Sequence, residues 1–176
     1  AGFTHWAKLN NLKQAAKTMN FLTEHGISSY GELESKLTAI SARRDTAHAE
    51  IKRIESRSAE LTLVMKHAGT YRQLKPLYDR YRKSNDKEKF LRGHESEIIL
   101  FEAAARELKR LGAVPLPTTE SMKTELANLN AEKERLLAEY KTTRTEAQEY
   151  DTVKQNVDAL LTVPKEQEQQ RRHELE

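Results

Sequence analysis

A run of basic residues interleaved with aromatic ones is the part of this sequence best suited to chemistry. Between Lys66 and Arg92 there are nine Lys or Arg residues against three acidic ones, a net charge of +6 in a chain of net charge +3. Lys and Arg bind phosphates by Coulomb attraction and counterion release. The pattern predicts a nucleic-acid contact, and its candidate residues are Arg72, Lys75, Arg80, Arg82, Lys83, Lys87, Lys89 and Arg92.

The aromatic residues of this run have two interpretations. Tyr71, Tyr78, Tyr81 and Phe90 can offer faces on which bases stack. Alternatively, because the three tyrosines share one helix face, the rings form an apolar core and the charges only keep the region soluble. The sequence leaves both interpretations open.

No motif for catalysis accompanies the basic run. HExxH, P-loop, GxGxxG and GxSxG patterns are absent, and no two histidines lie two residues apart. Asp45 and His48 share a helix face, as ligands do in some helix-bundle metal sites. No second such pair follows, so we interpret these two as surface hydrogen-bonding residues. We therefore predict no catalytic residue, no metal site and no cofactor in this chain.

The composition favours helices with narrow apolar seams. Of 176 residues, 37% are hydrophobic and 32% charged, and the mean hydropathy of −0.82 is too polar for a compact core. No apolar run approaches the roughly 20 residues of a membrane span, and no signal peptide is recognisable. The absence of Cys fits a reducing compartment. Because the chain begins at Ala1 rather than Met, we expect it to be an excised fragment.

Residues 29–83 are predicted to form one very long helix, which begins with a capping box at Ser29 and Glu32. Arg44 falls on its seam, while Gly69 and Pro76 predict a bend or short break. Apolar or small residues recur in steps of three, four or seven, the spacing of a coiled-coil seam, at Leu33, Leu37, Ile40, Ala47, Ile51, Ile54, Ser58, Leu61, Met65 and Ala68.

The last helix is predicted to start at Thr118 or Thr119 and to stop at Pro164. Lys133, Thr143 and Lys154 occupy seam sites between the apolar ones. The unbroken rhythm is the strongest periodic signal in the chain, with Met122, Leu126, Leu129, Leu136, Tyr140, Ala147, Tyr150, Val157 and Leu161 on the seam.

Two shorter helices complete the prediction. The first spans about residues 6–25, ends at Gly26 and docks through Leu9, Leu12, Ala16, Met19 and Leu22. The other spans about residues 87–111, is capped by Asn85 and ends at Gly112. Its apolar stripe is wide enough to face more than one neighbour and contains Ile98, Ile99, Leu100, Phe101, Ala104, Ala105, Leu108 and Leu111.

These elements predict an all-α fold: an elongated antiparallel coiled-coil hairpin with a short docked N-terminal helix and a thicker helical tip. We expect a docking helix in residues 1–28, a hairpin in residues 29–163 with its tip at about 66–117, and a polar tail in residues 164–176. Ala68 would then lie near Met122, and Leu33 near Leu161. In the alternative, a compact three-helix bundle, the seam from Leu33 to Met65 lacks an internal partner and demands a dimer.

Several segments resemble the region that follows the nuclease domain in relaxase/mobilisation nuclease proteins of bacterial conjugative and mobilisable elements. The similarity runs from about Trp6 to Leu161. It is carried by Trp6-Ala7-Lys8, residues 11–14, 16–18 and 20–27, Tyr78 to Lys83, Lys89-Phe90-Leu91 with His94-Glu95, Ile98-Ile99-Leu100 with Ala103-Ala104, and Leu111-Gly112 before Leu116-Pro117-Thr118.

The resemblance implies a parent protein that nicks one DNA strand through a tyrosine, with a histidine cluster holding a divalent metal. Those residues belong to the family's N-terminal domain, and none can be carried over to this chain. It therefore implies a non-catalytic, bacterial and cytoplasmic helical region. Its implied partners are origin-of-transfer DNA, relaxosome or coupling proteins, or a second copy in a homodimer, with no membrane contact. The alternative is a structural coiled-coil spacer or dimerisation module without nucleic-acid contact.

Overall fold

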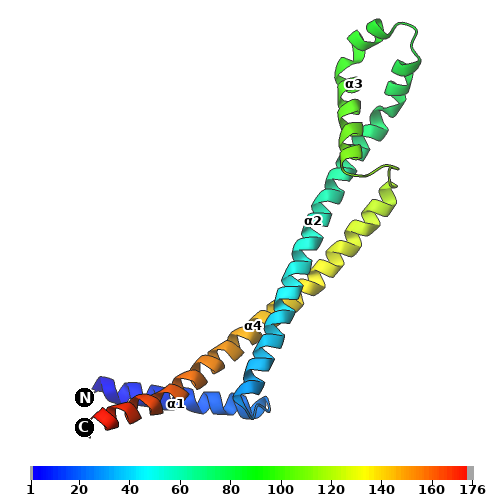
Figure 1. The fold of residues 1–176 in the computed structure, drawn as a ribbon. Coiled ribbons are helices and arrows are strands. Elements are labelled where there is room, and N and C mark those ends of the chain that lie inside the picture. Colours follow the sequence, from blue (N-terminus) through cyan, green and yellow to red (C-terminus); the bar gives the residue numbers. More distant parts are fainter. Residues whose placement is uncertain (1, 174–176) are drawn as a thin grey trace. The chain divides into compact units, whose positions relative to one another are not determined.

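The structure, a computed structural model, describes the backbone of residues 2–173 and the side chains of residues 10–162. These residues form four helices and no strand, which confirms the predicted all-α class (Figure 1). The chain divides into two compact units: unit 1 comprises residues 1–48 and 137–176, and unit 2 comprises residues 49–136. The helices are α1 (Gly2–Glu24), α2 (Tyr30–Lys83), α3 (Lys87–Arg110) and α4 (Thr119–His173).

None of the helices within the described residues has both the length and the apolar character needed to cross a membrane.

Local side-chain hydrogen bonds fix the helix starts. The Ser29 hydroxyl accepts a bond from the Glu32 backbone N–H, as predicted, and the Glu32 carboxylate accepts from the N–H and hydroxyl of Ser28. α3 is capped by Asp86, whose carboxylate accepts from the Lys89 N–H at 3.0 Å. The predicted cap at Asn85 is therefore wrong by one residue.

Two glycines end helices as the sequence predicts. Gly26 and Gly112 have φ of 61° and 69°, the left-handed region in which glycine carries no Cβ penalty. After each, the chain closes back on the helix, because the Ile27 N–H donates to the Leu22 carbonyl at 2.8 Å and the Ala113 N–H to the Leu108 carbonyl at 2.9 Å.

Prolines interrupt neither long helix. α2 is continuous through Gly69 and Pro76, which excludes the short break but not the bend that the sequence predicts there. α4 runs through Pro164 to His173, and the predicted helix end at Pro164 is also wrong. A proline removes one backbone hydrogen bond, and the neighbouring turns still form theirs.

Unit 1 is built from α1, the start of α2 and the second half of α4, with α1 lying alongside α4 (Figure 1). Its core contains Leu33 against Tyr150 and Val153, with half-buried Val157 packed on it. Leu161 is 58% exposed and lies outside this core. Leu33 and Leu161 nevertheless line one groove together with Val157, so Leu161 lies near Leu33 as predicted, at the edge of this core.

The predicted docking face of α1 is only partly correct: Leu22 packs on the core of unit 1, but the rest of the face that the structure describes is exposed. Leu12 and Met19 are 69% and 59% exposed, and the side chain of Leu9 lies outside the described residues. The buried face instead carries Thr18, whose hydroxyl accepts a hydrogen bond from the Asn156 amide at 3.2 Å. Phe21 packs next to it, edge-on to Tyr150.

A polar cluster fastens the start of α2 to α4 within unit 1. The Tyr30 hydroxyl donates to the Asp158 carboxylate at 2.7 Å, and the Lys154 ammonium donates to the same carboxylate at 3.0 Å. These hydrogen bonds, that of Tyr30 most strongly, hold the pKa of Asp158 below its ordinary value. Lys154 also lies 5.2 Å from the centre of the Tyr30 ring.

In unit 2, α2 pairs with the first part of α4. Ala68 and Met122 share one buried cluster, as the hairpin predicts. Two ion pairs flank the seam: Arg57 to Glu125 at 2.8 Å, and Lys133 to Glu55 at 2.7 Å. Because the α2 seam has an internal partner in each unit, the three-helix alternative is wrong.

α3 returns alongside the last part of α2 in unit 2 (Figure 1). Ile98, Phe101, Ala104 and Leu108 are buried at this contact. Two further members of the predicted wide stripe, Ile99 and Leu100, are 56% and 55% exposed. At the other end of the stripe, Leu108 and Leu111 share a cluster with Ala68 of α2 and Met122 of α4, so the stripe contacts a second neighbour, as predicted.

Candidate nucleic-acid interface

A row of aromatic rings in mutual contact, with Phe101 buried and the others half-buried, runs through the tip, which we define as residues 66–117. Phe101 of α3 stacks on Tyr71 and Tyr78 of α2, with ring centroids 4.8 and 4.1 Å apart. The row continues through Tyr81 and Phe90, whose centroids lie 5.9 Å from Tyr78 and 6.1 Å from Tyr81 respectively, and it ends at His94. We call these six residues the ring ladder. The core interpretation of the aromatics is the one that the contacts support.

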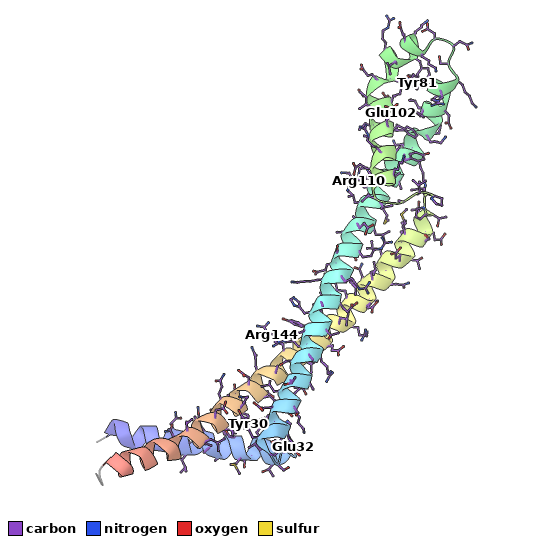
Figure 2. The ribbon with its side chains drawn as sticks, viewed as in Figure 1. Tyr30, Glu32, Tyr81, Glu102, Arg110 and Arg144 are labelled. Carbon is purple, nitrogen blue, oxygen red and sulfur yellow. The ribbon has the colours of Figure 1, made fainter. Side chains whose placement is uncertain are left out.

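The turn at residues 84–86 brings the end of α2 next to the start of α3. The Ser84 hydroxyl donates to the Asp86 carbonyl at 3.0 Å and accepts from the Asp86 N–H at 3.2 Å. His94 has φ −140° and ψ 23°, which kinks α3 about two turns after its start. Phe90, in the segment before the kink, thereby reaches Tyr81 across the turn (Tyr81 is labelled in Figure 2).

Three of the predicted phosphate-binding residues have partners within the chain. Arg72 donates to the Thr119 hydroxyl at 2.7 Å and to the Pro117 carbonyl. It therefore fastens the segment between α3 and α4, residues 111–118, which we call the connector. Lys75 donates to both oxygens of Asp79, which raises the pKa of Lys75. Arg92 lies 3.9 Å from Glu88. Arg72 and Lys75 are better explained as structural than as ligand-binding, whereas the contact of Arg92 joins two exposed side chains and contributes little.

Five predicted residues are exposed and have no ion-pair partner within the described part of the chain. We call them the turn cations, because the first three end α2 and the other two begin α3, on either side of the turn at 84–86. They are Arg80, Arg82, Lys83, Lys87 and Lys89.

The acidic groups next to the turn cations interact elsewhere. Asp79 binds Lys75, and Asp86 caps α3. Glu88 is exposed and lies 3.9 Å from Arg92. The tip therefore presents positive charge that its own carboxylates do not neutralise, an arrangement that attracts anions, above all phosphates.

The described residues show no cluster of metal-ligating side chains. They contain no group of three or more His, Cys, Asp or Glu that is able to hold a metal ion. Asp45 and His48 contact different partners: the Asp45 carboxylate accepts a hydrogen bond from Arg44 at 2.8 Å, and the His48 ring stacks on Tyr140.

A groove in unit 1 is the feature that sequence reasoning missed. It has a volume of about 470 Å³ and lies between α1 and α4. Its floor is the Thr18 and Asn156 contact, and polar side chains such as Gln14, Thr145 and Gln148 line it. No motif indicates such a groove, because it follows from which face of α1 packs on α4.

No protein-family model matches this chain, and comparison with curated proteins and with solved structures likewise finds no match.

Proposed function

We propose that this chain is a non-catalytic helical region that contacts DNA through the turn cations, as part of a DNA relaxase of the family that its sequence resembles. The observation that supports the contact is the gathering of five exposed cations at one turn, without acidic partners among the described residues. Cations that no carboxylate neutralises are available to phosphates.

In this proposal the nicking chemistry comes from a separate domain of the parent protein. The chain described here assists DNA binding at an origin of transfer, or the assembly of relaxosome and coupling proteins around it. A location in the bacterial cytoplasm is part of the same proposal. The resemblance of the α1 and tip segments to the relaxase family supports this part.

Fluorescence anisotropy with labelled DNA at low and moderate salt tests the contact. The informative variant reverses three turn cations together, Arg80→Glu, Arg82→Glu and Lys83→Glu. The matched control makes the same change in net charge on α4, at the exposed residues Lys123, Lys141 and Arg144 (Arg144 is labelled in Figure 2). We expect the tip variant to lose binding at low salt and the control to keep most of it. Because both variants lose the same long-range attraction, a difference between them reports the direct contacts of the turn cations.

A rival function is a structural spacer or dimerisation module without nucleic-acid contact. The engagement of the tip aromatics in the ring ladder favours it, since core rings need no ligand to explain them. Absence of DNA binding at low salt, or equal loss in the tip and control variants, would support this rival. Sedimentation over a concentration series then distinguishes a dimerisation module from a monomeric spacer.

A further inference from the structure

The ring ladder leaves the tip poorly equipped to bind bases. Tyr78 lies between Phe101 and Tyr81, and Tyr81 lies between Tyr78 and Phe90. Phe90 in turn lies between Tyr81 and His94. Proteins that bind single strands without sequence preference stack successive bases on exposed aromatic faces. Each of these three rings already has a ring neighbour on two sides.

The turn cations, by contrast, are all exposed. Arg80, Arg82 and Lys83 lie in the last turn of α2, where the helix dipole favours positive charge. Lys87 and Lys89 lie in the first turn of α3, where the dipole disfavours it. Helix stability therefore does not explain the positions of Lys87 and Lys89. They add to the positive end of α3, and this raises the potential that an approaching anion meets.

From these two observations we infer that the tip binds the phosphate backbone of duplex DNA, independently of sequence and without base stacking. The inference rests on the proposed function, of which it specifies the substrate. A ligand bound by charge alone is bound best where charge is densest. Duplex DNA carries one negative charge per about 1.7 Å of axis, twice the density along one of its strands.

The salt dependence follows from the number of cations. If three to five of them contact phosphates, the slope of log affinity against log salt is about −2.7 to −4.5 for duplex DNA. Affinity then falls about 40- to 500-fold between about 50 and 200 mM salt. Changing the base sequence of the duplex leaves the affinity unaltered.

Anisotropy with a duplex and with an oligo-dT strand of equal length tests the inference. We expect tighter binding to the duplex. The variant Lys87→Gln with Lys89→Gln should weaken it and reduce the salt slope by about one per lost contact. The same neutralisation at Lys123 and Lys141 of α4 is the matched control, and it should leave the slope unchanged.

A pair of variants at the ladder separates backbone binding from stacking. Tyr81→Phe keeps the ring and Tyr81→Leu removes it, and we expect both to bind the duplex as the wild type does. Circular dichroism checks that each is folded, and Tyr81→Phe provides the readout if Tyr81→Leu is not. Tighter binding of oligo-dT, weakened by Tyr81→Leu but not by Tyr81→Phe, would overturn the inference and leave the proposed function standing. If the chain binds neither ligand at low salt, both fail.

Discussion

Tyr78 and Phe101 stack with their ring centroids 4.1 Å apart and their planes 22° from parallel. Tyr78 belongs to α2 and Phe101 to α3, so this contact joins the two helices that carry the turn cations. Phe101 is only 5% exposed, and its ring also stacks on that of Tyr71. The packing of the tip therefore depends on this one side chain more than on any of its cations.

Phe101→Ala should destabilise the protein by about 3 kcal/mol, because truncation of a buried Phe loses apolar burial and leaves a cavity. Urea unfolding followed by circular dichroism measures this as a lower midpoint. Ile99→Ala, on the exposed side of the same helix, is the control and should change stability by less than about 0.5 kcal/mol. Equal effects of the two variants would contradict the packing described here.

Thr18→Val should destabilise by about 1–3 kcal/mol, since the Asn156 amide is then left without its partner. Asn156→Leu should have a similar effect through the buried Thr18 hydroxyl. In the double variant both polar groups are gone, and its loss of stability should be smaller than the sum of the single losses. Additive losses in a double-mutant cycle would show that the hydrogen bond does not couple α1 to α4.

Ser29→Ala removes the hydroxyl that accepts from the Glu32 N–H at the start of α2. Loss of an N-cap typically costs about 1 kcal/mol, and thermal unfolding should show the decrease. Ser35→Ala, an exposed substitution inside the same helix, provides the comparison and should be neutral or slightly stabilising, because Ala has the higher helix propensity. A neutral Ser29→Ala would indicate that Ser28 and Glu32 suffice as the cap.

Asp158 predicts a loss of stability in acid. Its pKa is lowered in the folded protein, so its contribution is complete above its ordinary value of about 3.9 and is lost as the pH falls through the folded value. Asp158→Asn should lower the melting temperature near neutral pH. Once the pH has fallen below the lowered folded pKa, the difference from wild type should close, because the carboxyl is then protonated in both states. A difference that persists in acid would assign the effect to packing instead.

The sequence predicts the long helices well because their seams are strictly periodic. Ile54 and Ala68 of α2 and Met122 and Thr143 of α4 are all buried at their predicted seam positions. The face of α1 could not be predicted in the same way. Leu12 and Met19 of its most apolar stripe are exposed, and only Leu22 packs on the core. The buried face carries Thr18 against Asn156, a contact between residues far apart in the sequence.

The density of charge in the sequence predicts where the candidate interface lies, but it does not predict which cations have partners within the chain. The pairing of Lys75 with Asp79 is an i, i+4 contact that the sequence contains. The engagement of Arg72 depends on where the connector at Pro117 passes, and the burial of the rings depends on α3 folding back along α2. Both are tertiary facts that periodicity does not encode.

The border between the two units falls at residues 48–49 and 136–137, inside α2 and α4 rather than in loops. A cut there would leave each half with severed helices and unpaired backbone groups at four new ends. Dissection of this protein into separately produced pieces is therefore better attempted at residues 84–86 or in the connector after Gly112. If residues 49–136 were expressed without the rest of α2 and α4, the severed helix ends would perturb unit 2, and its activity could not be judged from that fragment.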